Sequence, residues 1–142
     1  MSHIQLVAIF AENKPGQTAR VTGILANAHI NIRCATLAST GKFGVMKLLV
    51  NDPELACEAL KHEGFPATLI EVLAVQVPDK AGALHAIADC LARQGLNLDN
   101  LSGFVVNGQA VLVLEVQNPA QAREILQTQN LHVLTGEELL SL

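Results

Sequence analysis

The stretch NKPGQTARVTGILANAHINI, residues 13–32, decides the fold, because its pattern returns as DKAGALHAIADCLARQGLNL at residues 79–98. In both stretches a glycine-containing turn leads into a helix-forming segment and then to the start of a strand. The two stretches lie 66 residues apart, and identical residues continue at this offset without a gap. Such a fixed period indicates an internal duplication. The identical pairs include Ala8/Ala74, Lys14/Lys80, Gly16/Gly82, Leu25/Leu91, Asn31/Asn97, Val45/Val111, Leu48/Leu114, Val50/Val116, Pro53/Pro119, Ala56/Ala122, Glu58/Glu124 and Leu60/Leu126.

Each copy contains signals for six elements in the order strand, helix, strand, strand, helix, strand. A continuous apolar strand opens each copy, and the helix after the repeated loop carries apolar residues at i, i+3, i+4 and i+7. Turn residues at Gly41 and at Asn107-Gly108 separate the two middle strands. The first three strands are expected at Ile4 to Ala11, Ile32 to Ala38 and Gly44 to Val50 in copy one, and at about Ile70 to Val77, Leu98 to Val106 and Gln109 to Val116 in copy two.

The second helix of each copy has a clear start signal. Asp52-Pro53 and Asn118-Pro119 each supply an N-cap acceptor followed by a proline at the first helical position. Gly64 can end the first of these helices. A last strand is then expected near Phe65 in copy one and near Leu131 in copy two.

This order predicts an α+β fold made of two ferredoxin-like βαββαβ units, at residues 1–69 and 70–142. In each unit an antiparallel four-stranded sheet carries two helices on one face. Residues 67–77 contain no Gly, Pro or Ser, so we expect an extended apolar connection. A unit of 66 residues buries little surface, so we expect the two units to be held rigidly in a pseudo-twofold relation. Thr135 and Glu138 form a capping-box pattern that predicts one extra helical turn.

Composition excludes several classes of protein. The net charge is −4 and no run of Lys and Arg exists, so we expect no nucleic-acid partner. The longest apolar run is Leu6 to Ala11, far below the roughly 20 residues of a membrane helix, and no secretory signal is recognisable. We therefore expect no membrane partner and a cytoplasmic location. Cys34, Cys57 and Cys90 are odd in number and lack metal-ligand spacing, which indicates reduced thiols.

No catalytic or metal-binding pattern is found, so the sequence predicts a protein that is not an enzyme and needs no cofactor. The histidines lack the i, i+4 spacing and flanking carboxylates of a metal site. No serine lies in a nucleophile-elbow motif, and no motif places a histidine beside a cysteine. The histidines are His3, His29, His62, His85 and His132.

The repeated loop has chemistry that suits a carboxylate. Gly16 and Gly82 lie between a strand and a helix, where glycine permits backbone angles barred to other residues and lets a ligand approach the main chain. The helix that follows presents unpaired N–H groups and a partial positive charge. Its first turn is therefore a candidate anion site.

Two asparagines extend this candidate site. Asn31 and Asn97 precede the next strand, and we expect them near the same end of the unit as the loop. Their side-chain amides donate and accept, so they can meet an α-carboxylate or an α-ammonium group. Asp79, and less strongly Asn13, can accept from the ammonium group. Such a site favours a zwitterionic amino acid.

Each of these residues also has a purely structural interpretation. Both glycines can be turn requirements, and both asparagines can be left-handed residues at a helix end. Asp79 can cap the following helix. Lys14 and Lys80 can be solvated charges.

The two quoted stretches resemble the opening of the ACT domain, a small-molecule-sensing module of amino-acid biosynthetic enzymes. Its pattern is roughly Asn/Asp-x-Pro-Gly, a helix, and then Gly-x-Asn-Ile. The resemblance covers almost the whole chain, as two ACT units in tandem. Copy two departs from the pattern at Asp79 and Ala81, and copy one departs at His29, where copy two has Gly95.

The resemblance implies a ligand held between two units, contacted by the loop of one unit and by the second-strand asparagine of the other. Asn13 and Asn31 match that pair in copy one, and Asp79 and Asn97 match it in copy two. The candidate ligand-binding residues are therefore Asn13, Pro15, Gly16, Gln17, Asn31 and Ile32, together with Asp79, Gly82, Ala83, Asn97 and Leu98.

The sequence thus predicts a non-catalytic regulatory protein of tandem ACT domains that binds a small amino acid. A regulated enzyme, whose identity the sequence leaves open, would be a further partner. Exposed sheet edges and an uncovered sheet face predict a homodimer. One alternative is a ligand-free protein-interaction scaffold. Another is a small ferredoxin-like enzyme such as an acylphosphatase, which ranks last because the loops offer lysine where that enzyme needs arginine.

Overall fold

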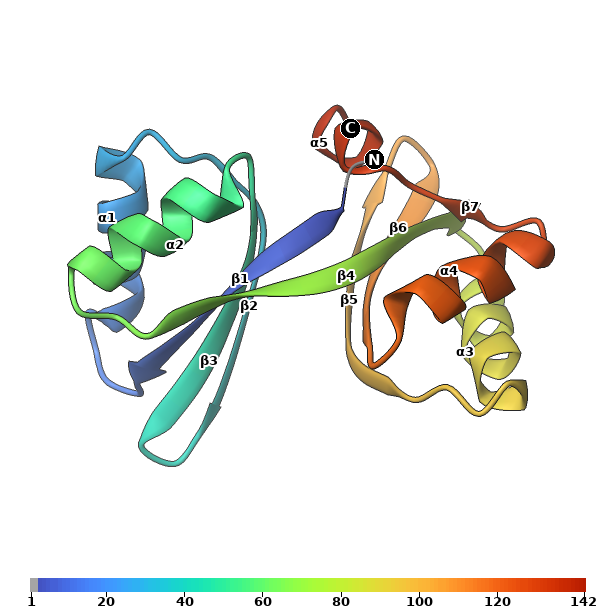
Figure 1. Cartoon of the computed structure of the whole chain (residues 1–142), viewed down its shortest axis with the longest axis horizontal. Helices are drawn as coiled ribbons and strands as arrows, with labels where there is room; N and C mark the ends of the chain where they lie inside the picture. The colour runs from blue at the N-terminus through green and yellow to red at the C-terminus, as the bar shows by residue number, and fades with distance from the viewer. Residues whose placement is uncertain (1–2) are drawn as a thin grey trace. The chain divides into compact units, whose positions relative to one another are not determined.

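The strands and helices of the computed structural model follow the order that the duplicated sequence predicts. The structure describes residues 3–142, and its contacts divide them into two units (Figure 1). The N-terminal unit comprises Gln5–Ile70, and the C-terminal unit comprises Glu71–Leu142 together with residues 3 and 4. Each unit combines antiparallel strand pairs with two long helices, so the predicted α+β fold class is confirmed.

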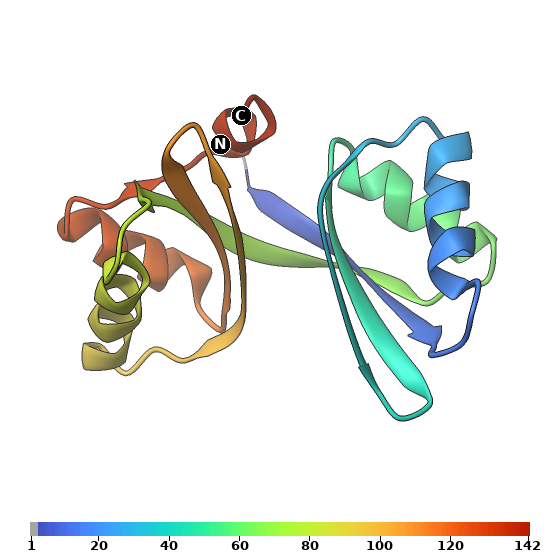
Figure 2. The same cartoon turned by 180° about the vertical axis from the view of Figure 1, so that it is seen from behind.

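In the N-terminal unit, helices α1 and α2 cover one face of a sheet with the order β2-β3-β1-β4 (Figures 1 and 2). Strand β3 pairs antiparallel with both β1 and β2. Alternate residues of the strands, among them Val7, Ile9 and Leu48, pack against Val21, Leu25 and Leu60 of the helices to form a buried core. The elements are β1 (Ile4–Glu12), α1 (Gln17–Asn27), β2 (Ile32–Thr40), β3 (Phe43–Val50), α2 (Pro53–His62) and the start of β4 (Ala67–Pro78).

The C-terminal unit repeats this arrangement, with α3 and α4 on one face of its sheet (Figure 2). Strand β6 pairs with β4 and β5, while the short β7 pairs with β4 at Val75 and Gln76. Its core includes Leu73, Ile87, Leu91, Leu114 and Leu126. The further elements are α3 (Ala83–Arg93), β5 (Leu98–Val106), β6 (Gln109–Val116), α4 (Pro119–Thr128), β7 (His132–Val133) and α5 (Gly136–Leu140).

Strand β4 joins two strands that the sequence places separately. The last strand of copy one was expected near Phe65 and the first strand of copy two at Ile70 to Val77, and the structure forms one strand over Ala67–Pro78. No Gly, Pro or Ser interrupts this segment before Pro78, so the chain remains extended. Residues up to Ile70 belong to the N-terminal unit, and residues from Glu71 belong to the C-terminal unit.

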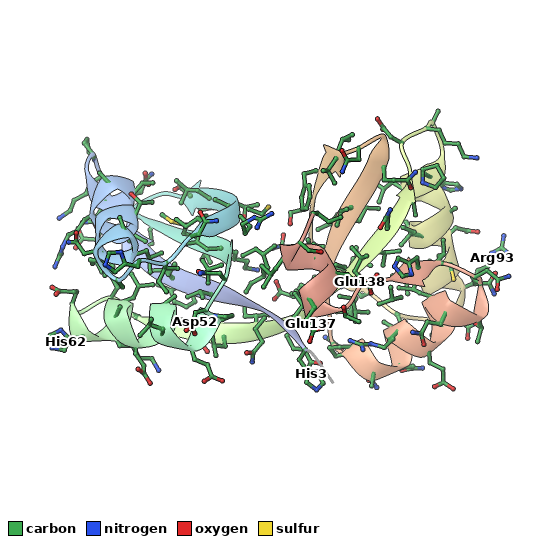
Figure 3. All side chains as sticks on the ribbon, turned by 90° about the horizontal axis from the view of Figure 1, so that it is seen from above. His3, Asp52, His62, Arg93, Glu137 and Glu138 are labelled. Atoms are coloured by element: carbon green, nitrogen blue, oxygen red, sulfur yellow. The ribbon has the colours of Figure 1, made fainter. Side chains whose placement is uncertain are left out.

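The predicted helix caps and turns are present. The Asp52 carboxylate accepts a hydrogen bond from the Leu55 N–H at 3.1 Å, and Asn118 caps α4 in the same way. Asp52 and His62 mark the two ends of α2 in Figure 3. Thr135 and Glu138 form the expected capping box, which starts α5. Left-handed residues form the hairpin turns at Gly41 and at Asn107-Gly108.

We expect Leu60→Ala to lower the free energy of unfolding by about 2–5 kcal/mol, because Leu60 is fully buried and its truncation leaves a cavity. Leu55→Ala, the same change at an exposed position of α2, serves as the control and should change it by less than about 0.5 kcal/mol. Urea unfolding measures both. An equal decrease in the free energy of unfolding of the two variants would contradict the assignment of Leu60 to the core.

Candidate functional site

Gly16 forms the corner between β1 and α1. Its φ of 89° is left-handed, and it occupies the N-cap position of α1, where no side chain caps the helix. The first-turn N–H groups of Thr18 and Ala19 therefore have no side-chain acceptor. A Cβ built at Gly16 would meet no atom within 4 Å. The corner is thus open, and it has the conformation that favours glycine.

Asn13 fastens this loop to the β2–β3 hairpin. Its backbone N–H donates to the Lys42 carbonyl at 2.7 Å, and its side-chain Nδ2 donates to the Gly41 carbonyl at 3.0 Å. The Asn13 Oδ1 makes no hydrogen bond within residues 3–142. These hydrogen bonds fix the orientation of the Asn13 amide, and its Oδ1 remains available as an acceptor at the loop. Pro15 is exposed between Lys14 and the Gly16 corner.

Gln17, the first residue of α1, carries an unsatisfied polar atom. Its Oε1 is buried and has no hydrogen-bond partner among the described residues. An orphaned buried acceptor costs about 1–3 kcal/mol, which a donor on a ligand would relieve. Gln17 lines two hollows beside the loop, one of about 40 Å³ that it shares with Asn13 and Thr18, and one of about 310 Å³.

The structure corrects the expected position of Asn31. Its N–H donates to the Asn51 Oδ1 at 2.9 Å and its carbonyl accepts from the Asn51 N–H at 3.2 Å, so it lies beside the end of β3. Asn13, in contrast, lies beside the hairpin where β3 begins. The eight residues of β3 separate them, roughly 25 Å at about 3.3 Å per residue. Asn31 and the loop of its own unit are therefore at opposite ends of the sheet.

The direction of the chain explains this separation. The chain leaves β1 at the loop, and α1 carries it back to the other end of the sheet before β2 begins at Ile32, which pairs with Val50. The same holds in copy two, where Leu98 pairs with Val116 while the Asp79 N–H donates to the Gly108 carbonyl at 3.4 Å. Consequently, one unit cannot bring its own loop and its own second-strand asparagine to one small ligand.

Two of the purely structural roles that the sequence suggests, one for Asn31 and Asn97 and one for Asp79, are wrong. The left-handed residues after the first helices are His29, with a φ of 59°, and Gly95, with a φ of 74°, and not Asn31 or Asn97. Asp79 does not cap α3, because the N-cap is Gly82, with a φ of 89° and no side-chain hydrogen bond.

The candidate binding residues of the two copies differ in their side-chain contacts. The Asn97 Nδ2 donates to the Asp99 carboxylate at 3.1 Å, whereas the Asn31 side chain makes no hydrogen bond within the described residues. Lys14 lies 3.5 Å from the Glu12 carboxylate. Copy two places Ala83 where copy one has Gln17, so its loop lacks the orphaned amide.

Sequence reasoning missed four residues beside the loop. Phe10, Phe43, Phe65 and Arg20 line the hollow of about 310 Å³ together with Lys14 and Gln17. They come from β1, β3, α1 and the turn after α2, so no local motif joins them. The available signal was the distribution of aromatic residues: at an offset of 66, copy two has no aromatic residue at any of the three phenylalanine positions.

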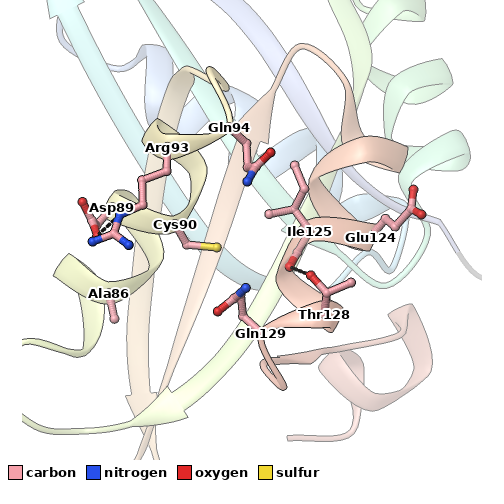
Figure 4. A pocket seen from close by; sticks show the side chains of 9 residues that line it. All are labelled: Ala86, Asp89, Cys90, Arg93, Gln94, Glu124, Ile125, Thr128 and Gln129. Carbon is pink, nitrogen blue, oxygen red and sulfur yellow. Dashed lines mark hydrogen bonds and ion pairs between the residues drawn. The ribbon is translucent and has the colours of Figure 1, made fainter.

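A larger groove, of about 540 Å³, lies between α3 and α4 (Figure 4). Arg93 Nε pairs with Asp89 Oδ2 at 2.9 Å there, and the Thr128 hydroxyl donates to the Ile125 carbonyl at 2.7 Å. None of the residues predicted for the ligand site lines this groove. Arg93 and Asp89 neutralise each other there, and the groove contains no buried unpaired polar atom among the described residues, so it gives less support for a ligand than the loop of copy one.

Other features of the described residues bear on chemistry. Within residues 3–142, no group of three or more His, Cys, Asp and Glu side chains is placed to hold a metal ion. No helix in that range is long and apolar enough to cross a membrane. Burial raises the pKa of the Cys34 thiol, which keeps it protonated at neutral pH.

Comparisons with known proteins agree with this architecture. A family model described as "ACT domain pair" matches residues 1–142. The solved structure of protein BT0572 from Bacteroides thetaiotaomicron has a TM-score of 0.93 and 28% identity, covering 99% of this chain and 98% of that chain. The regulatory subunit of aspartate kinase from Thermus thermophilus has a TM-score of 0.64 and 18% identity, over 89% and 91%. The same subunit from Thermus flavus has a TM-score of 0.62 and 16% identity, over 90% and 92%. No curated protein matches significantly.

We expect Gly16→Ala to lower the free energy of unfolding by about 1 kcal/mol, because a side chain is strained at a φ of 89° even in open space. Gly23→Ala is the matched control. Gly23 lies inside α1, and a Cβ built there would meet no atom within 4 Å. The free energy of unfolding of this variant should therefore rise by about 0.5–1 kcal/mol. Chemical denaturation compares them. A Gly16→Ala variant as stable as Gly23→Ala would refute the left-handed corner.

Proposed function

Because the chain belongs to the ACT domain family, as a pair of ACT domains over residues 1–142, we propose that it is a non-catalytic regulatory protein that binds a small amino acid at the loop between β1 and α1. The observation that carries the proposal is the open Gly16 corner beside the orphaned Gln17 Oε1. The corner offers donors to a carboxylate, and the amides beside it offer acceptors to an ammonium group. A zwitterion meets both needs.

The carboxylate belongs at the N-terminus of α1. The helix is uncapped by any side chain, and its first-turn N–H groups carry the positive end of the helix dipole. Backbone N–H groups at this position bind anions without requiring a cationic side chain. Lys14 adds a positive charge, although Glu12 already lies 3.5 Å from its Nζ.

The ammonium group belongs beside Asn13 and Gln17. The Asn13 Nδ2 is used by the Gly41 carbonyl, so the amide presents its Oδ1 as an acceptor. Gln17 supplies a second acceptor in its unpaired Oε1. An ammonium group has three donors and can use both oxygens.

The asparagine contact requires a second unit. Asn31 lies at the other end of its sheet from the loop of its own unit, as the hydrogen bonds to Asn51 show. An amino acid that contacts a loop and a second-strand asparagine must therefore take them from different units. The equivalent residues of copy two are Asp79 and Asn97, and the Asp79 carboxylate favours an ammonium group.

Ligand binding at such a site regulates by changing how units associate. A ligand shifts an equilibrium only by its difference in affinity between two states, and a ligand that needs two units favours the associated state. The partner that responds would be an enzyme or a second copy of this chain. The free thiols Cys34, Cys57 and Cys90 suit a reducing cytoplasm.

We expect one or more of the common amino acids to raise the melting temperature of the full chain. At a ligand concentration of about 100 times the Kd the stabilisation is about 2.7 kcal/mol, which corresponds to roughly 5–10 °C. Asn31→Ala should abolish most of this shift without changing the stability of the free protein, because only the backbone of Asn31 is hydrogen-bonded. Asn97→Ala should likewise weaken binding.

Asn27→Ala, the same change at an exposed position of α1, is the control and should keep the full shift. No shift and no calorimetric heat with any common amino acid would instead favour a ligand-free scaffold.

The proposed assembly is a homodimer. Among the described residues, β2 pairs only with β3 and β5 only with β6, so each unit has an open edge strand. Leu37 on β2 and Val105 on β5 are both more than half exposed. Open edges with exposed apolar residues are commonly covered by another chain.

We therefore expect light scattering at micromolar concentration to give twice the mass of one chain. Leu37→Glu should weaken the dimer, because it adds a charge to the β2 edge, while Leu55→Glu, at an exposed position of α2, should not. A monomeric wild-type protein would rule out the homodimer.

A further inference from the structure

An aromatic pocket adjoins the loop of copy one. It is the hollow of about 310 Å³ lined by Phe10, Phe43, Phe65, Lys14, Gln17 and Arg20. Three of the four phenylalanines in the chain thus meet at one place, and the sequence has no Trp or Tyr. Aromatic side chains are thus concentrated at this pocket and rare elsewhere in the chain, which indicates a functional role.

The aromatic pocket combines one buried ring with two exposed rings. Phe65 is buried, with only 6% of its surface exposed, and the Arg20 guanidinium lies 4.9 Å from the centre of its ring. Arg20 is also held by a hydrogen bond from its Nη2 to the Glu63 carbonyl at 3.2 Å. One edge of the pocket therefore carries an oriented positive charge.

Phe10 and Phe43 are the two exposed rings. Phe10 lies opposite Val45 and Phe43 lies opposite Glu12 in the β1–β3 pair, so the two rings occupy diagonal positions on one face of the sheet. Diagonal neighbours are about 7–8 Å apart, within reach of aromatic side chains. Phe10 is 50% exposed and Phe43 is 65% exposed. Two adjacent rings left this open to water offer apolar surface to a ligand ring.

The aromatic pocket is adjacent to the proposed amino-acid site. The small hollow beside Asn13 and Gln17 and the aromatic pocket share Ala11, Glu12, Lys14 and Gln17. A molecule whose charged end meets the loop can thus extend its side chain between Phe10 and Phe43. The volume of about 310 Å³ is at the lower end of the range for small-molecule sites, which suits a ligand the size of an amino acid.

Copy two lacks this pocket. At the offset of 66 residues, Gln76 replaces Phe10, Gln109 replaces Phe43 and Leu131 replaces Phe65. Ala86 stands at the position of Arg20, and Ala83 at the position of Gln17. The backbone corner is shared, because Gly16 and Gly82 both have a φ of 89°. The two copies therefore differ in the side chains that would contact a ligand and not in the turn.

Resting on the proposed function, we infer that the loop of copy one selects an amino acid with an aromatic side chain, whose ring lies between Phe10 and Phe43. The carboxylate is neutralised by the α1 N-terminus with Lys14 and Arg20, and the ammonium group reaches Gln17. Aromatic rings pack well against other aromatic rings and beside guanidinium groups. A serine or alanine ligand would leave the pocket unfilled.

The test is calorimetric titration of the full chain with L-phenylalanine, L-tryptophan, L-leucine and L-serine. At least one aromatic amino acid should bind ten or more times more tightly than leucine, and leucine more tightly than serine. Phe43→Ala should weaken binding of the aromatic ligand at least tenfold. Since Phe43 is largely exposed, its truncation should leave the fold intact. Gln109→Ala, at the equivalent position of copy two, should leave the affinity unchanged within twofold.

A second titration examines the role of Gln17. 3-Phenylpropionate has the ring and the carboxylate of phenylalanine but no ammonium group, so it should bind at least tenfold more weakly than L-phenylalanine. In Gln17→Ala this difference should shrink, because the acceptor is gone. Equal affinities of the two compounds for the wild type would overturn the assignment of Gln17.

The outcomes separate this inference from the proposed function. If leucine or serine binds most tightly and Phe43→Ala has no effect, the aromatic selection is wrong although the protein remains an amino-acid sensor. If no amino acid binds, both are wrong. If Phe43→Ala leaves affinity unchanged but lowers the mass measured by light scattering, the exposed rings belong to a protein interface and the inference is overturned.

Discussion

The left-handed corner at Gly16 is the constraint on which the rest of the site depends. A φ of 89° at the N-cap turns the chain directly from β1 into α1 and leaves no side chain to cap the helix. The donors of the first helical turn therefore remain available to an anion. Asn13 holds the loop against the β2–β3 hairpin, so the corner is kept open by two hydrogen bonds that do not involve a ligand.

The path of the chain then limits how these groups can be combined. Helix α1 returns the chain to the far end of the sheet, which places Asn31 beside Asn51 and away from the loop. An amino acid bound at the loop of one such unit therefore cannot also contact the second-strand asparagine of the same unit. Duplication supplies a second loop and a second asparagine within one chain. An amino acid that makes both predicted contacts must take them from two different units.

The sequence predicted the features that depend on neighbouring residues. Asp52 and Asn118 cap the second helices, Asn107 and Gly108 form a hairpin turn, and Thr135 starts α5, because each signal lies within a few residues of its effect. The repeat also predicted the order of strands and helices. The position of Asn31 was predicted wrongly, since periodicity does not say at which end of a sheet a strand begins.

The aromatic pocket could not be predicted from local patterns. Phe10, Phe43, Phe65 and Arg20 lie on four separate segments, and only the pairing of β1 with β3 and the turn after α2 bring them together. A comparison of the two copies does show that copy two has no aromatic residue at the positions that correspond to Phe10, Phe43 and Phe65. Divergence between duplicated units can therefore mark a site even where the shared motif describes only the turn.

The most direct test of the central claim is an NMR titration that follows the backbone amides of the full chain as L-phenylalanine is added. If the corner binds the ligand carboxylate, the amide signals of Gly16, Thr18 and Ala19 should shift progressively and saturate. Gly23, on the same helix but outside the first turn, provides an internal reference that should move little. Saturable shifts elsewhere, with the signals of residues 16–19 unchanged, would contradict the account.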